Sequence, residues 1–69
     1  MKISARNQLK AKVKNIAPGA INSEIVLTLP GGQEVVATIT NTSVKELGLS
    51  VGSDAYAIIK ASNVIVGVD

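Results

Sequence analysis

The chain has 69 residues, 46% of them hydrophobic, with seven basic and five acidic side chains and a net charge of +2. It has no Cys, His, Trp or Phe, which excludes disulfides, thiolate or imidazole metal sites and Ser–His or Cys–His catalysis. One aromatic ring, Tyr56, is too few to stack bases, and two excess charges are a weak footprint for nucleic acid. The five carboxylates form no acid–base pair, so we expect neither an enzyme nor a nucleic-acid-binding protein.

The length predicts a single domain spanning residues 1–69. A domain of this size is only marginally stable alone. The mean hydropathy of the chain is nevertheless +0.36, which is high for a small protein whose whole surface faces water and favours burial of apolar surface against other copies of the chain. The longest apolar run, 55–59, is far shorter than the roughly 20 residues of a membrane-spanning helix. The N-terminus also lacks the apolar stretch of a signal peptide. We therefore expect a cytoplasmic homo-oligomer with no membrane partner.

Period-two alternation of apolar and polar residues dominates the first half of the chain. It predicts strands at 9–16, 21–29 and 34–40. A turn at Pro18-Gly19 separates the first two strands, and a hairpin loop at 30–33 separates the second and third. These three strands should form an antiparallel meander.

A short helix is predicted after the third strand. Ser43 with Glu46 three residues later fits a capping box, and Thr42 is an equally good N-cap. Gly48 can supply the left-handed residue that ends the helix. One or two helical turns fit between these signals.

Two further strands are predicted, at 55–60 and at 64–68, with a break at 61–63. The order is then three strands, a short helix and two strands. This order predicts an all-β fold, a small five-stranded OB-like Greek-key barrel with the helix between strands three and four. An SH3-like barrel is the alternative.

Three polar clusters remain outside the predicted sheet, at 4–7, 40–43 and 60–63. All three combine hydroxyl or amide donors with free backbone N–H groups, two also carry a cation, and none has a carboxylate. Such a set suits an anion and not Ca²⁺ or Mg²⁺, which need oxygen acceptors such as carboxylates. The simpler readings are a solvated arm, a helix cap and a strand-end lysine, and the residues by themselves leave these open.

Five segments resemble motifs of the molbindin, or molybdenum-pterin-binding (Mop), family, in the family's order and spacing. They are SARNQL at 4–9, GAINSE at 19–24, ITNTSV at 39–44, LGLSVG at 47–52 and IKASNV at 59–64. The resemblance covers essentially the whole chain.

The resemblance implies a cytoplasmic protein that binds molybdate, with tungstate as a mimic, for molybdenum storage and homeostasis. It also implies a hexamer, a trimer of dimers, with the oxyanions at subunit interfaces. The same domain occurs with additional domains in regulators and importer ATPases, and this sequence carries none, which favours storage. Carriage of a molybdenum-pterin cofactor is the main alternative, and an OB-type nucleic-acid-binding module is a weaker one.

The resemblance also assigns residues to the oxyanion sites. One subunit would contribute Ser4, Arg6, Lys60, Ala61 and Ser62. The neighbouring subunit would contribute Thr40 and Ser43. A second candidate site would use the turn Gly19, Ala20, Ile21 and Asn22, in which Ile21 stands where the family has Val.

Overall fold

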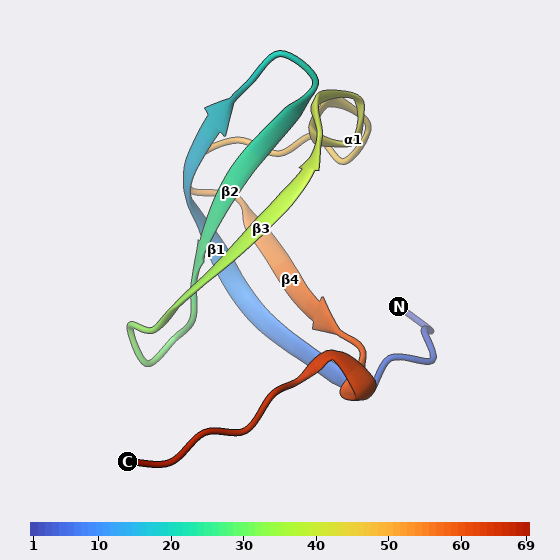
Figure 1. Cartoon of the computed structure of the whole chain (residues 1–69). Helices are drawn as coiled ribbons and strands as arrows, with labels where there is room; N and C mark the ends of the chain where they lie inside the picture. The colour runs from blue at the N-terminus through green and yellow to red at the C-terminus, as the bar shows by residue number, and fades with distance from the viewer.

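The computed structural model describes all residues, 1–69, and shows one curled antiparallel sheet with a short helix at one end (Figure 1). The sheet has four strands in the order β3-β2-β1-β4. A six-residue helix, α1, follows β3 directly, and a 3₁₀ turn follows β4. The elements are β1 (Asn7–Pro18), β2 (Asn22–Thr28), β3 (Glu34–Thr40), α1 (Asn41–Glu46), β4 (Asp54–Ile59) and the 3₁₀ turn (Ala61–Asn63).

The long strand β1 joins the two halves of the sheet. Its first half, up to Lys12, pairs with β4, and its second half pairs with β2. The register with β2 shifts between Val13 and Asn15, which marks a β-bulge. Because of this extra residue, Val13 and Ile16 both pack on the core although they lie three positions apart. The predicted meander of β1, β2 and β3 is confirmed.

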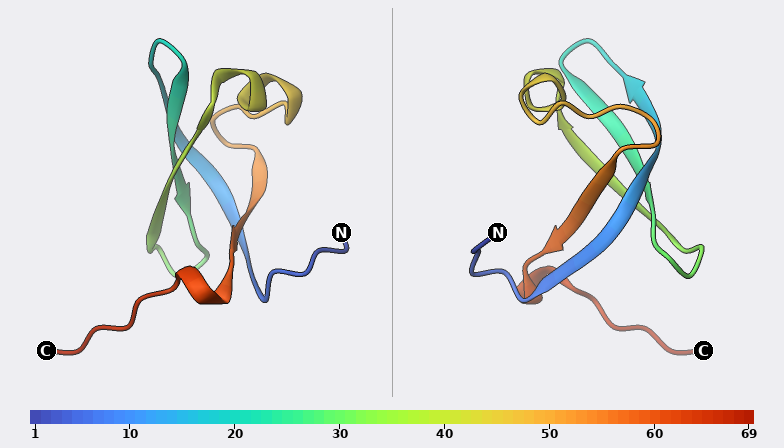
Figure 2. Two further views of the ribbon diagram at one scale, coloured as in Figure 1. Left: turned by 45° about the vertical axis from the view of Figure 1, so that its right-hand side comes forward. Right: turned by 180° about the vertical axis from the view of Figure 1, so that it is seen from behind.

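The buried core is small. Six of the 69 residues are buried, and the hydrophobic ones are Ala11, Val13, Ile25, Leu27 and Ala57. The accessible surface is 5316 Å². A compact monomer of 7.1 kDa would expose only about 4,100 Å². The extended ends of the chain, which leave the sheet in different directions (Figure 2), contribute to this excess.

The predicted fifth strand is not formed. Residues 64–69 have no secondary structure, and Ile65 and Val68 are each 94% exposed. Alternating β-branched residues favour a strand, but a strand also needs a neighbouring edge, and the 3₁₀ turn directs this segment away from the sheet (Figures 1 and 2). The sheet therefore has four strands, not five, and stays open between β3 and β4.

The N-cap of α1 is Thr40, so the predicted caps Ser43 and Thr42 are wrong. Thr40 has extended backbone angles, and its hydroxyl accepts the Ser43 backbone N–H at 3.0 Å. Because β3 continues into the helix without a loop, the last residue of the strand, Thr40, is also the N-cap of the helix. Ser43 then occupies the third helical position, and Glu46, at the end of the helix, belongs to no capping box.

The helix ends as predicted at Gly48, whose φ is +63°. The Gly48 N–H donates to the Lys45 carbonyl at 3.0 Å, and the Leu49 N–H donates to the Val44 carbonyl at 3.1 Å. This pair of bonds is the Schellman motif, and both Val44 and Leu49 pack against the core. The helix is thereby fixed to the end of β3.

Substitution Gly48→Ala is expected to lower the free energy of unfolding by about 1 kcal/mol, because a Cβ is unfavourable in the left-handed region. Gly48→Asn should recover most of the loss, since Asn tolerates this conformation. Urea denaturation at one protein concentration measures both variants. Equal stability of the alanine variant and the original protein would contradict the assignment of Gly48 as the helix-ending residue.

Candidate oxyanion-binding site

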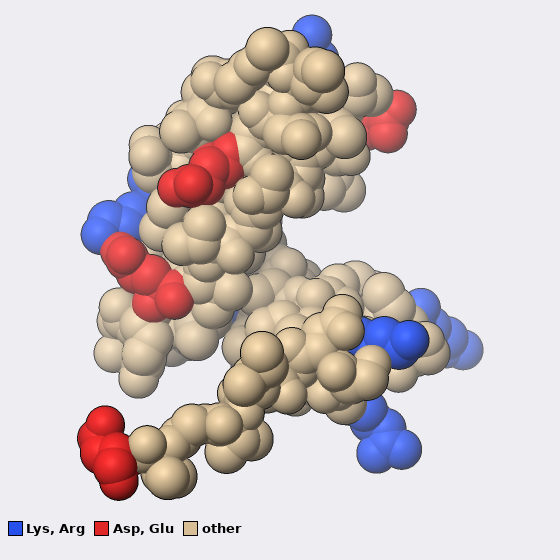
Figure 3. Space-filling model, viewed as in Figure 1, with Lys and Arg blue, Asp and Glu red and all other residues tan.

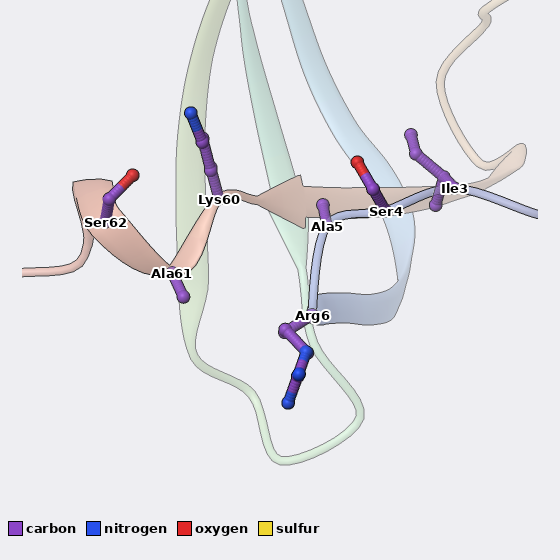
Figure 4. A pocket seen from close by; sticks show the side chains of 7 residues that line it. All are labelled: Ile3, Ser4, Ala5, Arg6, Lys60, Ala61 and Ser62. Atoms are coloured by element: carbon purple, nitrogen blue, oxygen red, sulfur yellow. The ribbon is translucent and has the colours of Figure 1, made fainter.

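An open hollow lies where β1 begins and β4 ends, with a volume of about 420 Å³. Its walls come from the N-terminal segment and from the turn after β4 (Figure 4). Five of the residues assigned to the first site lie here, together with two apolar residues that the sequence did not single out. The lining is Ile3, Ser4, Ala5, Arg6, Lys60, Ala61 and Ser62.

Hydrogen bonds from two amide side chains hold the walls of the hollow. Asn7 pairs with Ile59 across the sheet, and its Nδ2 donates to the Ile59 carbonyl at 3.1 Å. The Nε2 of Gln8 donates to the Ala5 carbonyl at 2.9 Å. Asn7 and Gln8 therefore fasten the N-terminal segment to the sheet and to itself. They place Ser4 and Arg6 opposite the turn that carries Lys60.

The polar side chains of the hollow do not all point the same way. Figure 4 shows Ser4, Lys60 and Ser62 extending to one side and the Arg6 side chain extending to the other. The backbone bends at Ser4 and at Arg6, so residues two apart do not share a face as they would in a strand. In one chain, Lys60 is thus the cation that lies on the same side of the hollow as the two serine hydroxyls.

Neither cation of the hollow has an acidic partner. The two ion pairs of the chain are Lys12 with Asp54, at 2.9 Å, and Lys14 with Glu34. A hydrogen bond from Lys12, together with its charge, lowers the pKa of Asp54 below its usual value. Basic side chains gather beside the N-terminal segment, with no acidic side chain among them on the face in Figure 3. The hollow is therefore electropositive.

Thr40 and Ser43 lie at the opposite end of the sheet. The hollow is beside the first residue of β1, whereas Thr40 is opposite Asn22, just past the other end of β1. Twelve residues at about 3.3 Å each separate these ends by roughly 30 Å or more. One small anion cannot contact both sets in one chain. The structure thus does not bring these two residues together with the other five.

The second assigned set forms the turn between β1 and β2. The Gly19 N–H donates to the Asn22 carbonyl at 2.7 Å, and a Cβ on Gly19 would lie 2.8 Å from the same oxygen. Only glycine fits there without a shift. Because Asn22 is opposite Thr40 in the sheet, this turn and the start of α1 are neighbours. Two of the three assigned groups therefore share one end of the molecule.

Two residues that were assigned to neither site, Ser23 and Asn41, connect this turn to the helix. Asn41 donates its backbone N–H to the Ile21 carbonyl at 2.8 Å and its Nδ2 to the Gly19 carbonyl at 3.0 Å. Its Oδ1 accepts the hydroxyl of Ser23 at 2.5 Å. Ser23 is 3% exposed. The signal in the sequence is a lone hydroxyl among inward-facing apolar positions, since a buried polar group requires a partner.

The chemistry available at both ends of the sheet is that of an anion host. The hollow offers hydroxyls and two cations as hydrogen-bond donors, and no carboxylate lines it. The assigned residues at the other end offer hydroxyl, amide and backbone donors without a cation or a carboxylate. The chain has no group of three or more His, Cys, Asp or Glu residues that could hold a metal ion. Nor does any helix have the length and apolar character that crossing a membrane requires.

Residues 3–66 match the family model of the TOBE domain. The probable molybdenum-pterin-binding protein of Haemophilus influenzae is 52% identical over 69 residues, which are all of this chain and all of that protein.

Two solved structures are also similar. MopII from Clostridium pasteurianum superposes with a TM-score of 0.91 at 39% identity, over 97% of this chain and 100% of that one. The cytoplasmic molybdate-binding protein ModG, with molybdate bound, superposes with a TM-score of 0.95 at 51% identity, over 100% of this chain and 49% of that one. The chain therefore belongs to the TOBE-domain family, as a Mop-type domain of the molybdenum-pterin-binding proteins.

Proposed function

We propose that this protein binds molybdate, with tungstate as a mimic, in the hollow beside the start of β1. The observation that carries the proposal is a hollow lined by two unpaired cations and two serine hydroxyls, with no carboxylate in its lining. Relatives described as molybdate-binding or molybdenum-pterin-binding proteins support the choice of anion. The proposed contacts from this side are Ser4, Arg6, Lys60, Ala61 and Ser62.

Molybdate is a tetrahedral dianion with four acceptor oxygens and no proton to donate. A host that offers only donors and about two positive charges therefore complements it, and hydrogen bonds to a charged group are the stronger kind. Arg6 and Lys60 supply the charge, and Ser4 and Ser62 supply directional bonds. Sulfate has the same charge and shape at a smaller size, so selectivity must come from the size and rigidity of the closed site.

A neighbouring copy of the chain completes this site in our proposal. Thr40 and Ser43 lie too far from the hollow to act within one chain, so they would reach the hollow of another subunit. The Thr40 hydroxyl donates to the Ser43 hydroxyl at 2.8 Å, which holds the two oxygens together. A second subunit over the open hollow would also exclude water and strengthen each hydrogen bond to the anion.

The surface of the chain supports such an assembly. An apolar groove of about 340 Å³ opens between the β3 and β4 sides of the sheet, where Figure 3 shows the molecule hollowed. The exposed segment 64–68 has the alternating apolar character of a missing fifth strand. A second copy is the partner that supplies this segment. We propose a homo-oligomer, a hexamer arranged as a trimer of dimers. The groove is lined by Met1, Ile25, Leu27, Ala37, Ile39, Leu47, Leu49, Asp54, Ala55, Tyr56 and Ile58.

Within the cell we propose a cytoplasmic role in molybdenum storage and homeostasis, performed by the single domain 1–69 without catalysis. The description of ModG as cytoplasmic supports the location. The donor-only hollow supports reversible holding of an anion, since it has no acid–base pair or nucleophile–base pair for a reaction.

A molybdenum-pterin cofactor is the second candidate ligand, because relatives carry that name. The hollow has no aromatic ring against which a pterin could stack, and its apolar lining is Ile3, Ala5 and Ala61. Molybdate itself therefore fits the residues better.

Metal analysis of the purified protein, combined with pterin fluorescence, separates the two ligands. We expect molybdenum without pterin fluorescence, and calorimetric titration of the anion-free protein should show molybdate binding that a sulfate excess does not abolish. Molybdenum that co-purifies with stoichiometric pterin would favour the cofactor carrier. No molybdate binding by the folded, assembled protein would overturn the proposed function.

A further inference from the structure

We propose that Asn41 is a positioning residue that locks the turn 19–22 and the start of α1 into one unit, so that the two candidate oxyanion segments respond to molybdate together. This inference rests on the proposed function, because it concerns the same ligand. It adds a residue outside the assigned sites, one that need not touch the anion itself.

Asn41 makes three hydrogen bonds to the turn and to the residue that follows it. Its backbone N–H, its Nδ2 and its Oδ1 each bond to a different residue of the segment 19–23. The three partners are the Ile21 carbonyl, the Gly19 carbonyl and the Ser23 hydroxyl. Such a clamp fixes both distance and orientation, since a shift of the turn would break several bonds at once.

The position of Asn41 in the chain places it between the two candidate oxyanion segments. It follows the N-cap Thr40 directly and lies two residues before Ser43. Thr40 is also held across the sheet by its pairing with Asn22, the last residue of the turn. The helix start and the turn are thus joined by sheet pairing on one side and by the Asn41 side chain on the other. An anion that orders one segment lowers the entropic cost of ordering the other.

The residue that anchors this clamp, Ser23, is buried. Ser23 is 3% exposed and donates to the Oδ1 of Asn41, which also fixes which end of the amide faces Gly19. Loss of Asn41 would leave this hydroxyl buried without an acceptor, which is costly. A buried serine in an otherwise apolar row is therefore explained by its bond to Asn41.

Asn41→Ala is expected to weaken molybdate binding by roughly three- to thirty-fold, the loss typical of one or two hydrogen bonds that organise a site. Thr42→Ala is the matched control, because Thr42 is exposed on the same helix and its side chain makes no hydrogen bond to the protein. The control should bind as the original protein does. Ser23→Ala removes the buried anchor and should weaken binding in the same direction, and it serves if Asn41→Ala does not fold.

Amide resonances followed during a molybdate titration give a readout that a purely structural role would not move. In the original assembled protein, the signals of residues 19–22 and 40–43 should shift over the same range of molybdate concentration. In Asn41→Ala, the midpoints of the two groups should differ at least threefold.

Three results would overturn the inference while leaving the proposed function intact. One is separate titration of the two groups in the original protein. Another is a common midpoint and unchanged affinity in Asn41→Ala and Ser23→Ala. The third is binding that shifts residues 3–6, 40–43 and 60–62 but leaves residues 19–22 unmoved. Absence of molybdate binding in the original protein would instead remove the proposed function and this inference with it.

Discussion

Lys60→Ala is expected to weaken molybdate binding from roughly thirty-fold to a few thousand-fold. The Lys60 side chain extends to the same side of the hollow as Ser4 and Ser62 (Figure 4), and it has no acidic partner. Lys60 is exposed in the single chain, and in the proposed assembly a neighbouring subunit would bury it with the anion. Truncating one partner of a buried charge pair typically costs about 2–5 kcal/mol, and each 1.4 kcal/mol is a factor of ten. Calorimetric titration of the folded, assembled variant measures the change. Lys45→Ala removes an exposed lysine outside the hollow and should bind normally.

The comparison with Arg6 sharpens this test. Arg6→Ala should weaken binding within the same range, and Arg6→Lys should recover part of it, because an ammonium lacks the planar fork of the guanidinium. The Arg6 side chain points away from Lys60 in one chain, so its contact with the anion requires a rotation of that side chain within the assembly. Binding within threefold of the original protein would show that Arg6 is a solvated arm residue. Unchanged molybdate affinity in Lys60→Ala would show that molybdate does not bind in this hollow.

The sequence predicted those elements whose signals are local. Alternation located β1, β2 and β3, and the turn signals located the loops between them. Gly48 marked the end of α1 because its conformation is a property of one residue. The bulge after Val13 was also visible in principle, as the polar pair Lys14-Asn15 where one polar residue would keep the period.

The predictions that were wrong concern segments whose structure depends on a neighbouring segment. Residues 64–68 have the preferences of a strand, but no edge of their own chain lies beside them. Ser43 and Thr42 are good N-caps by type, yet the continuity of β3 with α1 gives that role to Thr40. Local preference cannot show which neighbour is present.

For the candidate site too, the sequence indicated local features but not the contacts between distant segments. Composition and the three polar clusters indicated an anion, but nothing in the periodicity joined residues 4–6 to residues 60–62. That pairing came from the family resemblance, and the structure places the two segments around one hollow. The clamp of Asn41 on the turn was missed because it depends on side-chain bonds between segments 18 to 22 positions apart.

The open sheet leads to the second large effect, which concerns residues 64–68. Ile65, Val66 and Val68 are 86–94% exposed, an arrangement that is unfavourable in water for three β-branched or apolar side chains in one short segment. The sheet meanwhile keeps two unpaired edges, β3 and β4, beside an apolar groove. The same segment of a second chain would pair with the free strand edge and cover the apolar groove.

Ile65→Asp with Val66→Asp is therefore expected to dissociate the assembly and, with it, to abolish molybdate binding, since Thr40 and Ser43 would no longer reach the hollow of a neighbour. The isolated chain keeps its core, because residues 64–68 contribute nothing to it, so the far-ultraviolet spectrum should remain that of a β-protein. Sedimentation equilibrium at micromolar concentration gives the mass directly. The original protein should sediment as a multiple of 7.1 kDa and the variant near 7.1 kDa.

Lys2→Asp is the matched control at the other terminus and should leave the mass of the assembly unchanged. An original protein that is monomeric would contradict both the assembly and the shared site, whereas an assembled double variant would move the interface away from this segment.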